Sequence, residues 1–266
     1  MTRLERPEGV EIHWESHGEG PTVVLAHHTL FSYPWVYERL IDDLTRDHRV
    51  VIYDPRGCGQ SSRRGPYDVD TDAADLQAVV EVAGGAAVGI VVGDGLNRGA
   101  RVAVARPDLI PRLIAIVPGA AMVLPRAELR GSGVMAGSDS VMDMLLQMLS
   151  TDPRAALRTI LAAINPGLEE DELRERLDRV TAYLSAEAAT ERANAWLEDD
   201  LSALVSTLGE RIWILHGGSD PLFEGALGER VAELFPRARL QALADGPISR
   251  PELTAAFVRA VTEGAR

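Results

Sequence analysis

The sequence has little cysteine and no long hydrophobic run. Its single cysteine, Cys58, excludes an internal disulfide and gives no indication of an oxidising compartment. Because Cys58 stands between two glycines in a turn-like stretch, we interpret it as a small turn residue and not as a reactive thiol. No apolar run approaches the ~18 residues of a membrane-spanning helix, and the first residues lack the apolar segment of a signal peptide. We therefore expect a cytoplasmic protein.

Positive charge is also scarce. The 266 residues include 27 Lys and Arg against 40 Asp and Glu, which gives a net charge of −13. Such a surface repels nucleic acids and anionic membranes, so we expect neither as a partner. A small molecule is the expected ligand. The sequence leaves the oligomeric state open between a monomer and a homodimer.

Short strand-like runs alternate with helical patterns over most of the chain. Several runs are continuous Val, Ile and Leu stretches, as in strands that are buried on both faces of a parallel sheet. The predicted strands are 10–14, 22–26, 49–53, 88–92, 113–117, 212–215 and 239–243, and the predicted helices between them are 35–46, 70–83, 96–106, 226–235 and 251–263. This alternation predicts an α/β fold with a doubly wound, mostly parallel sheet. Ligands of such folds bind beyond the carboxyl ends of the strands.

The alternation stops in one internal segment. Residues 122–208 show no convincing strand and four helical patterns, at 139–150, 153–164, 169–185 and 188–205. We interpret 122–208 as a helical cap or lid, inserted into a core made of 1–121 and 209–266. Met144 and Met148 are among four methionines near its start, which could line an adaptable apolar pocket. The same helical spacing fits ordinary core packing, so both interpretations stay open.

The stretch Asp54-Pro55-Arg56-Gly57-Cys58-Gly59-Gln60-Ser61 follows a predicted strand and carries the strongest motif. It resembles the D-x-R-G-x-G-x-S turn of the α/β-hydrolase superfamily, in particular of its capped members similar to prolyl iminopeptidases, epoxide hydrolases and enol-lactonases. Further matches in the same order are 23–27, Asp75, 106–108, 216–221 and 250–252. The resemblance implies the α/β-hydrolase fold over the whole chain.

The catalytic triad that this resemblance implies is incomplete. In the family's G-x-S-x-G elbow the serine is the nucleophile, and here Gly95 of Gly93-Asp94-Gly95 takes its position. We expect a left-handed φ at Gly95, which only glycine adopts without strain. Pro247 stands where the family has its histidine, and no histidine follows His216. Of the triad only the acid, Asp220, remains.

Residues near the elbow supply other candidates. The family has His-Gly in its oxyanion loop, whereas this chain has His27-His28-Thr29. We expect the imidazole of His28 to lie at the mouth of the site, where the volume above Gly95 would admit it or a ligand, and we assign His28 a role in proton transfer. His27 is the expected hydrogen-bonded support. Predicted substrate contacts are His27, Thr29, Gly95, Leu96, Met144 and Met148.

Asp94 has three possible roles. It could act as a general acid or base if burial raises its pKa. It could be a covalent nucleophile, as in the epoxide hydrolases and dehalogenases of this superfamily. It could also cap the following helix without any chemistry.

The sequence gives no sign of a metal or a cofactor. His27 and His28 are adjacent, so in a strand they would face opposite ways, and no other cluster has metal-ligand spacing. A phosphate loop of the form G-x-G-x-x-G would need a glycine at position 98, which is Arg98. We expect neither group.

Three functions remain open. The first is an enzyme that acts on a small apolar organic substrate by non-covalent acid–base chemistry: epoxide or lactone opening, cyclisation or a lyase step. His28 and Asp94 would transfer the proton, with Asp220 as a supporting carboxylate. The second is a catalytically inactive pseudo-hydrolase that binds a small molecule. The third is a hydrolase with Asp94 as covalent nucleophile. Fold analogy alone does not decide among them.

Overall fold

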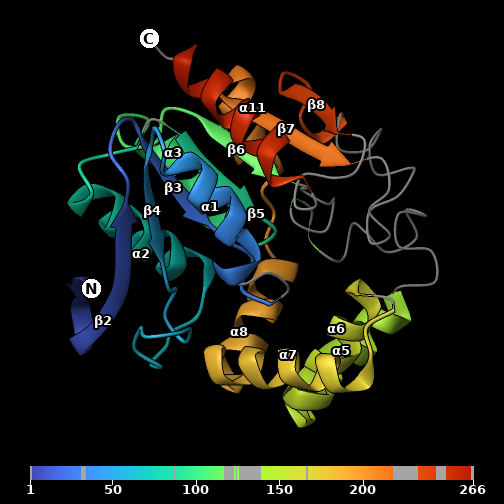
Figure 1. Ribbon diagram of the computed structural model, residues 1–266. Helices are drawn as coiled ribbons and strands as arrows, with labels where there is room; N and C mark the ends of the chain where they lie inside the picture. The colour runs from blue at the N-terminus through green and yellow to red at the C-terminus, as the bar shows by residue number, and fades with distance from the viewer. Residues whose placement is uncertain are drawn as a thin grey trace.

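A single eight-stranded sheet forms the centre of the computed structural model (Figure 1). The structure describes residues 2–30, 34–86, 88–116, 123, 125, 139–165, 167–217, 233–243 and 250–264. The strands are β1 (Thr2–Arg6), β2 (Val10–His17), β3 (Thr22–Ala26), β4 (Arg49–Tyr53), β5 (Val88–Val92), β6 (Leu113–Ile116), β7 (Ile212–Gly217) and β8 (Arg239–Leu243), in the order β1-β2-β4-β3-β5-β6-β7-β8. Only β1–β2 and β2–β4 pair antiparallel. The predicted mostly parallel sheet is confirmed.

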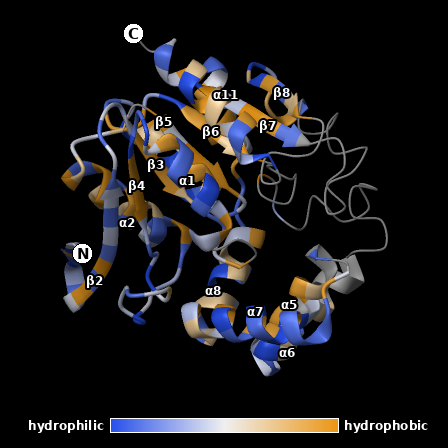
Figure 2. Ribbon diagram, viewed as in Figure 1, coloured by the Kyte–Doolittle hydropathy of each residue, from blue (hydrophilic) through white to orange (hydrophobic). Residues whose placement is uncertain are grey.

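Helices cover both faces of this sheet. On one face lie α1 (Glu38–Leu44) and α11 (Pro251–Glu263), and on the other lie α2 (Val69–Val82) and α3 (Gly95–Ala105). Strand β5 shows how one strand serves two cores, because Ile90 and Val92 belong to the core under α1 and α11, and Val91 to the core under α2 and α3. Figure 2 shows the resulting concentration of hydrophobic residues in the central strands.

The strand predictions agree closely with the structure. All seven are confirmed, with ends that differ by three residues or fewer where both ends are described. The prediction missed β1, whose side chains are mostly exposed and therefore form no hydrophobic run. The predicted helix at 226–235 lies largely outside the described residues.

A run of helices lies between β6 and β7 in the chain. It consists of α5 (Asp139–Thr151), α6 (Pro153–Ile164), α7 (Glu170–Tyr183), α8 (Ala186–Leu197) and α9 (Ser202–Leu208), and we call it the helical insertion. The prediction of a single helix at 188–205 is wrong, because the helix is interrupted between the end of α8 and the start of α9. Asp199 leaves the helical path to bind Arg101 of α3 at 2.7 Å, and Asp200 accepts a hydrogen bond from the Ser202 amide at 2.9 Å.

The helical insertion is fixed to the turn that follows β4. The Gly59 amide donates to the Tyr183 carbonyl at 2.8 Å, and the Ser185 amide donates to the Gly57 carbonyl at 2.9 Å. Arg192 of α8 is buried and pairs with Asp72 of α2, with 2.5 Å between Nε and Oδ2. A buried ion pair of this kind is costly to break from one side, so it holds the two parts in one arrangement. None of the helices among the described residues is long and apolar enough to cross a membrane.

Candidate functional site

The connection from β5 to α3 is a sharp bend. Strand β5 ends at Val92, Gly93 has a φ of +55°, and α3 begins at Gly95. The left-handed residue is therefore Gly93, and its prediction at Gly95 is wrong, because Gly95 is already the first residue of α3. Glycine adopts this backbone conformation without the strain that other residues incur. Gly93 thus stands at the tip of the elbow, and Asp94 comes next.

The ring of His28 fills the space beside Gly93. A β-carbon built on Gly93 would lie 2.2 Å from Cδ2 and 2.5 Å from Cγ of His28. Contacts this short do not occur, so a side chain at position 93 and His28 in its present place exclude each other. Where an elbow nucleophile would begin, this chain has an imidazole from the loop after β3.

Asp94 is the carboxylate beneath this imidazole. It is 2% exposed, and its Oδ1 lies 3.0 Å from Nδ1 of His28 and accepts from the Thr29 amide at 2.9 Å. The Thr29 hydroxyl donates to Oδ2 in a short hydrogen bond, and Arg98 Nη1 lies 3.4 Å from the same oxygen. All these groups present a proton or a positive charge, so Asp94 is surrounded by donors.

The surrounding donors keep the carboxylate of Asp94 ionised. Burial alone would raise the pKa of Asp94, but Arg98 and His28 outweigh it and hold the pKa well below its ordinary value of 3.8. The hypothesis that burial raises this pKa is therefore wrong. An anionic carboxylate suits the orientation of a histidine, and it has no proton to donate as a general acid.

Arg98 is a site residue that the sequence analysis missed. It is 1% exposed, and its Nη2 donates to the His27 carbonyl while Nη1 faces Asp94. Burial alone would lower the pKa of Arg98, but Tyr53 and Asp94 more than offset it, so the guanidinium stays charged. The spacing of four residues between Asp94 and Arg98 at the start of a helix is the signal that could have revealed the pair.

His27 connects the loop after β3 to the helical insertion. Its Nδ1 lies 3.0 Å from the His28 carbonyl oxygen, and the Tyr183 hydroxyl lies 3.1 Å from its Nε2. Tyr183 also donates to Asp54 Oδ1 at 2.9 Å. Burial, reinforced by Arg98, lowers the pKa of His27 to about 4, so this imidazole is neutral near pH 7. These contacts agree with the predicted support role.

Comparison with known proteins supports the fold assignment. A profile described as alpha/beta hydrolase fold matches residues 22–130. An esterase from Exiguobacterium antarcticum superposes with a TM-score of 0.80 at 18% identity, over 98% of this chain and 99% of its own. The enol-lactonase from Burkholderia xenovorans superposes with a TM-score of 0.73 at 20% identity, over 96% of each chain. Residues 22–130 are thus similar to this family, and the chain as a whole has the α/β-hydrolase fold.

Two curated proteins are similar in sequence over most of this chain. The putative carbamate hydrolase RutD of Caulobacter vibrioides is 28% identical over 248 residues, which cover 88% of this chain and 87% of RutD. The polyketide synthase ThaQ of Burkholderia thailandensis is 28% identical over 250 residues, 91% of this chain. The chain spans only 11% of ThaQ.

Within this α/β-hydrolase fold, Gly95 and Leu96 serve packing. A β-carbon on Gly95 would lie 2.0 Å from the Ala26 carbonyl oxygen, so glycine allows α3 to approach β3 closely. The expected free volume above Gly95 is therefore wrong, because backbone occupies it. Leu96 is 1% exposed and belongs to the core on the α2 and α3 face.

The remaining predicted residues fall in three places. Thr29 is fully buried and donates to Asp94, as described above. Met144 is 46% exposed, which gives no support to a pocket-lining role, and Met148 packs against the core. Asp220 and Pro247 lie outside the described residues. Among the described residues, no three His, Cys, Asp or Glu side chains are grouped so that they could hold a metal ion.

Proposed function

We propose that this chain is an α/β-hydrolase-fold enzyme that has lost the nucleophile and the histidine of the triad and transfers protons through His28. The observation that carries the proposal is the overlap of the His28 ring with the space beside Gly93. Folds of this kind bind their ligands beyond the carboxyl ends of the strands, and the group found there is an imidazole, which can both accept and donate a proton.

Asp94 supports His28 in this scheme. A carboxylate oxygen only accepts, so the 3.0 Å contact with His28 requires the proton on Nδ1 and leaves the lone pair on Nε2. The Leu30 amide lies 3.2 Å from the same Nδ1, but a charge-assisted bond to Asp94 is the stronger of the two. Nε2, which is buried, then takes a proton from the water molecule that attacks the substrate carbon and passes it to the leaving oxygen as the bond between that oxygen and carbon breaks, without a covalent enzyme intermediate.

The substrate we propose is a small, largely apolar organic molecule bound between the sheet edge and the helical insertion, which would act as its cap. RutD is named for a carbamate and the Burkholderia xenovorans protein for an enol-lactone. Both compounds carry an ester-like carbonyl, so lactone opening is the first reaction to test, followed by epoxide opening, cyclisation and lyase steps. We propose a cytoplasmic protein that needs no cofactor.

Two alternative functions stay open. Asp94 as a covalent nucleophile is the weaker, because its oxygens are held by Thr29, His28 and Arg98 and its side chain is buried. A pseudo-hydrolase that binds a small molecule without turnover is favoured by the same lack of a nucleophile at Gly93.

A panel of lactones and epoxides tests the proposal. We expect His28→Ala to abolish turnover and His17→Ala to leave it unchanged, since His17 has a side chain 47% exposed and lies away from Asp94. Binding without product across the panel would favour the pseudo-hydrolase. Single turnover in H₂¹⁸O would place label in Asp94 only under the covalent scheme. Labelling of the protein by a serine-directed fluorophosphonate would contradict the proposal directly.

A further inference from the structure

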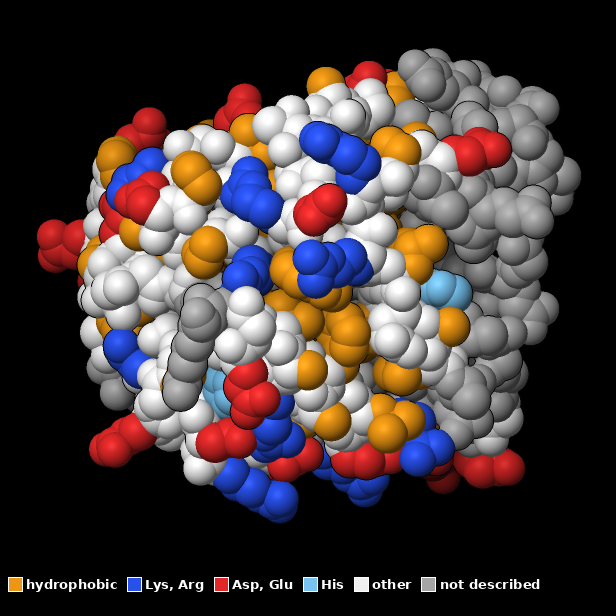
Figure 3. Space-filling model, turned by 90° about the horizontal axis from the view of Figure 1, so that it is seen from above, with side chains coloured by type: hydrophobic (Ala, Val, Ile, Leu, Met, Phe, Trp, Pro, Cys, Tyr) orange, Lys and Arg blue, Asp and Glu red, His pale blue; other side chains and the backbone are white. Residues whose placement is uncertain are grey.

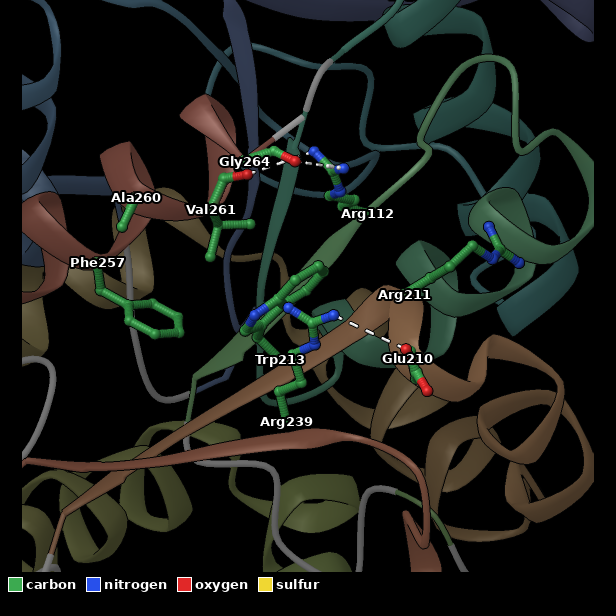
Figure 4. Close-up of a pocket in the computed structure, with 9 residues that line it drawn as sticks. All are labelled: Arg112, Glu210, Arg211, Trp213, Arg239, Phe257, Ala260, Val261 and Gly264. Atoms are coloured by element: carbon green, nitrogen blue, oxygen red, sulfur yellow. Dashed lines mark hydrogen bonds and ion pairs between the residues drawn. The ribbon is translucent and has the colours of Figure 1, made fainter. Parts of the chain in front are cut away.

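A hollow lies at the edge of the sheet opposite to His28. It has a volume of about 380 Å³ and is lined by Arg112, Glu210, Arg211, Trp213, Arg239, Phe257, Ala260, Val261 and Gly264 (Figure 4). Arg112 precedes β6, Trp213 lies at the start of β7, and Arg239 begins β8. Because these strands are parallel to β3 and β5, the hollow lies at their amino ends, whereas His28 and Asp94 follow the carboxyl ends.

The charge of this lining is opposite to that of the chain. Acidic residues outnumber basic ones by 40 to 27 overall, yet the lining holds three arginines and one glutamate. Arg112 donates to the Gly264 carbonyl at 3.0 Å, and Arg211 donates to the Ala103 carbonyl at 2.9 Å. Carbonyl groups fix these side chains but do not neutralise them, so the hollow keeps a surplus of positive charge.

Arg239 is the arginine best placed for a ligand. Its Cζ lies 5.1 Å from the centroid of the Trp213 ring, and the Arg112 Cζ lies 5.9 Å from it, so both guanidinium groups are held over one indole. Among the described residues, Arg239 pairs only with the carboxylate of Glu210, at 3.7 Å, which is beyond a hydrogen bond. Within the part of the chain that the structure describes, no hydrogen bond uses the donors of Arg239.

The other wall of the hollow is apolar. It is made by Trp213 of β7 and by Phe257, Ala260 and Val261 of α11. On the face viewed from above, Figure 3 shows basic side chains over hydrophobic ones. An inorganic anion would leave the apolar wall uncovered, and a neutral aromatic compound would supply no negative charge to the exposed guanidinium of Arg239, whose side chain is 61% exposed. The lining therefore suits a ligand with both parts.

We propose that this hollow binds a small aromatic carboxylate. The carboxylate accepts hydrogen bonds from the guanidinium fork of Arg239, and the ring lies against Trp213 and Phe257. The site is separate from His28 and does not depend on the proposed reaction.

Titration calorimetry with 2-naphthoate tests this site on the full chain. We expect saturable binding that Arg239→Gln weakens about tenfold or more, since hydrogen bonds to charged groups are the strong ones. Arg174→Gln, at an exposed residue of α7, is the matched control and leaves the affinity unchanged, as does His28→Ala. The neutral analogue 2-naphthalenemethanol binds more weakly than 2-naphthoate.

A second measurement needs no change at Arg239. In the unsubstituted protein the ¹⁵N–¹H signal of the Trp213 indole, assigned with Trp213→Phe, shifts as 2-naphthoate is added. Absence of saturable binding overturns the proposal. The proposal is also overturned if 2-naphthoate binds no more tightly than 2-naphthalenemethanol, or if a folded Arg239→Gln variant keeps the affinity of the unsubstituted protein for 2-naphthoate. A Trp213 signal that does not move while 2-naphthoate binds would overturn it as well.

Discussion

The ring of His28 occupies the space that a side chain at Gly93 would need. The position of a β-carbon on Gly93 lies 2.2 Å from Cδ2 of His28, although 65 residues separate the two in the chain. The absence of a nucleophile at the elbow and the presence of an imidazole beside it are therefore linked by packing. A change at either residue has consequences for the other, which a double-mutant cycle can measure.

Gly93→Ala tests this relationship. The new methyl group meets the His28 ring and the backbone keeps a φ of +55°, so we expect a loss of about 2 to 4 kcal/mol in the free energy of unfolding. His28→Gly removes the ring, and adding it to Gly93→Ala should recover the part of the loss that comes from contact. Urea denaturation of both single variants and the double variant measures the coupling. Strict additivity of the two changes would mean that the residues do not compete for space.

Asp94→Asn tests the charge at the centre of the site. The amide leaves Arg98 buried without its carboxylate, so we expect a loss of about 3 to 5 kcal/mol in the free energy of unfolding. Asp171→Asn, at a carboxylate whose side chain is 86% exposed, is the matched control and should change it by less than about 0.5 kcal/mol. Because the folded state lowers the pKa of Asp94, its contribution is present above the ordinary value of 3.8 and is lost as the pH falls toward the folded pKa. A variant as stable as the parent chain would contradict the role of Asp94 as the acceptor for Arg98.

His27 predicts a pH dependence of stability. Its pKa falls from 6.5 to about 4 on folding, so between these values the unfolded chain binds more protons and stability rises with pH. We expect this residue to remove about 2 kcal/mol from the free energy of unfolding between pH 7 and pH 5. Urea denaturation at both pH values checks this. In His27→Gln the difference between the two pH values should shrink by that amount, and an unchanged difference would show that His27 does not titrate in this way.

The sequence predicts what depends on local pattern. Continuous apolar runs give the strands, and strand order along a parallel sheet brings the loop with His28 and the loop with Asp94 to one edge. The position of the left-handed residue was missed, because matching Gly93 to the first glycine of the family motif placed the bend at Gly95, which is already in α3. Tyr183 was missed because its partners are set by tertiary packing: it is 156 residues from His27. Arg98 was missed although its partner Asp94 lies only four residues away in the chain.

Tyr183→Phe tests how the helical insertion is held to the sheet. The hydroxyl of Tyr183 joins α7 to Asp54 and His27, and its loss leaves the partly buried carboxylate and the buried imidazole without that contact. We expect the free energy of unfolding to fall by about 1 to 3 kcal/mol. Amide hydrogen exchange should also quicken at Ser185 and Gly59, whose amides bond across the same junction. Arg174→Gln, on the same helix but exposed, should leave these rates unchanged. If exchange at Ser185 and Gly59 stays slow in Tyr183→Phe, the backbone bonds and the Arg192–Asp72 pair hold the insertion without the tyrosine.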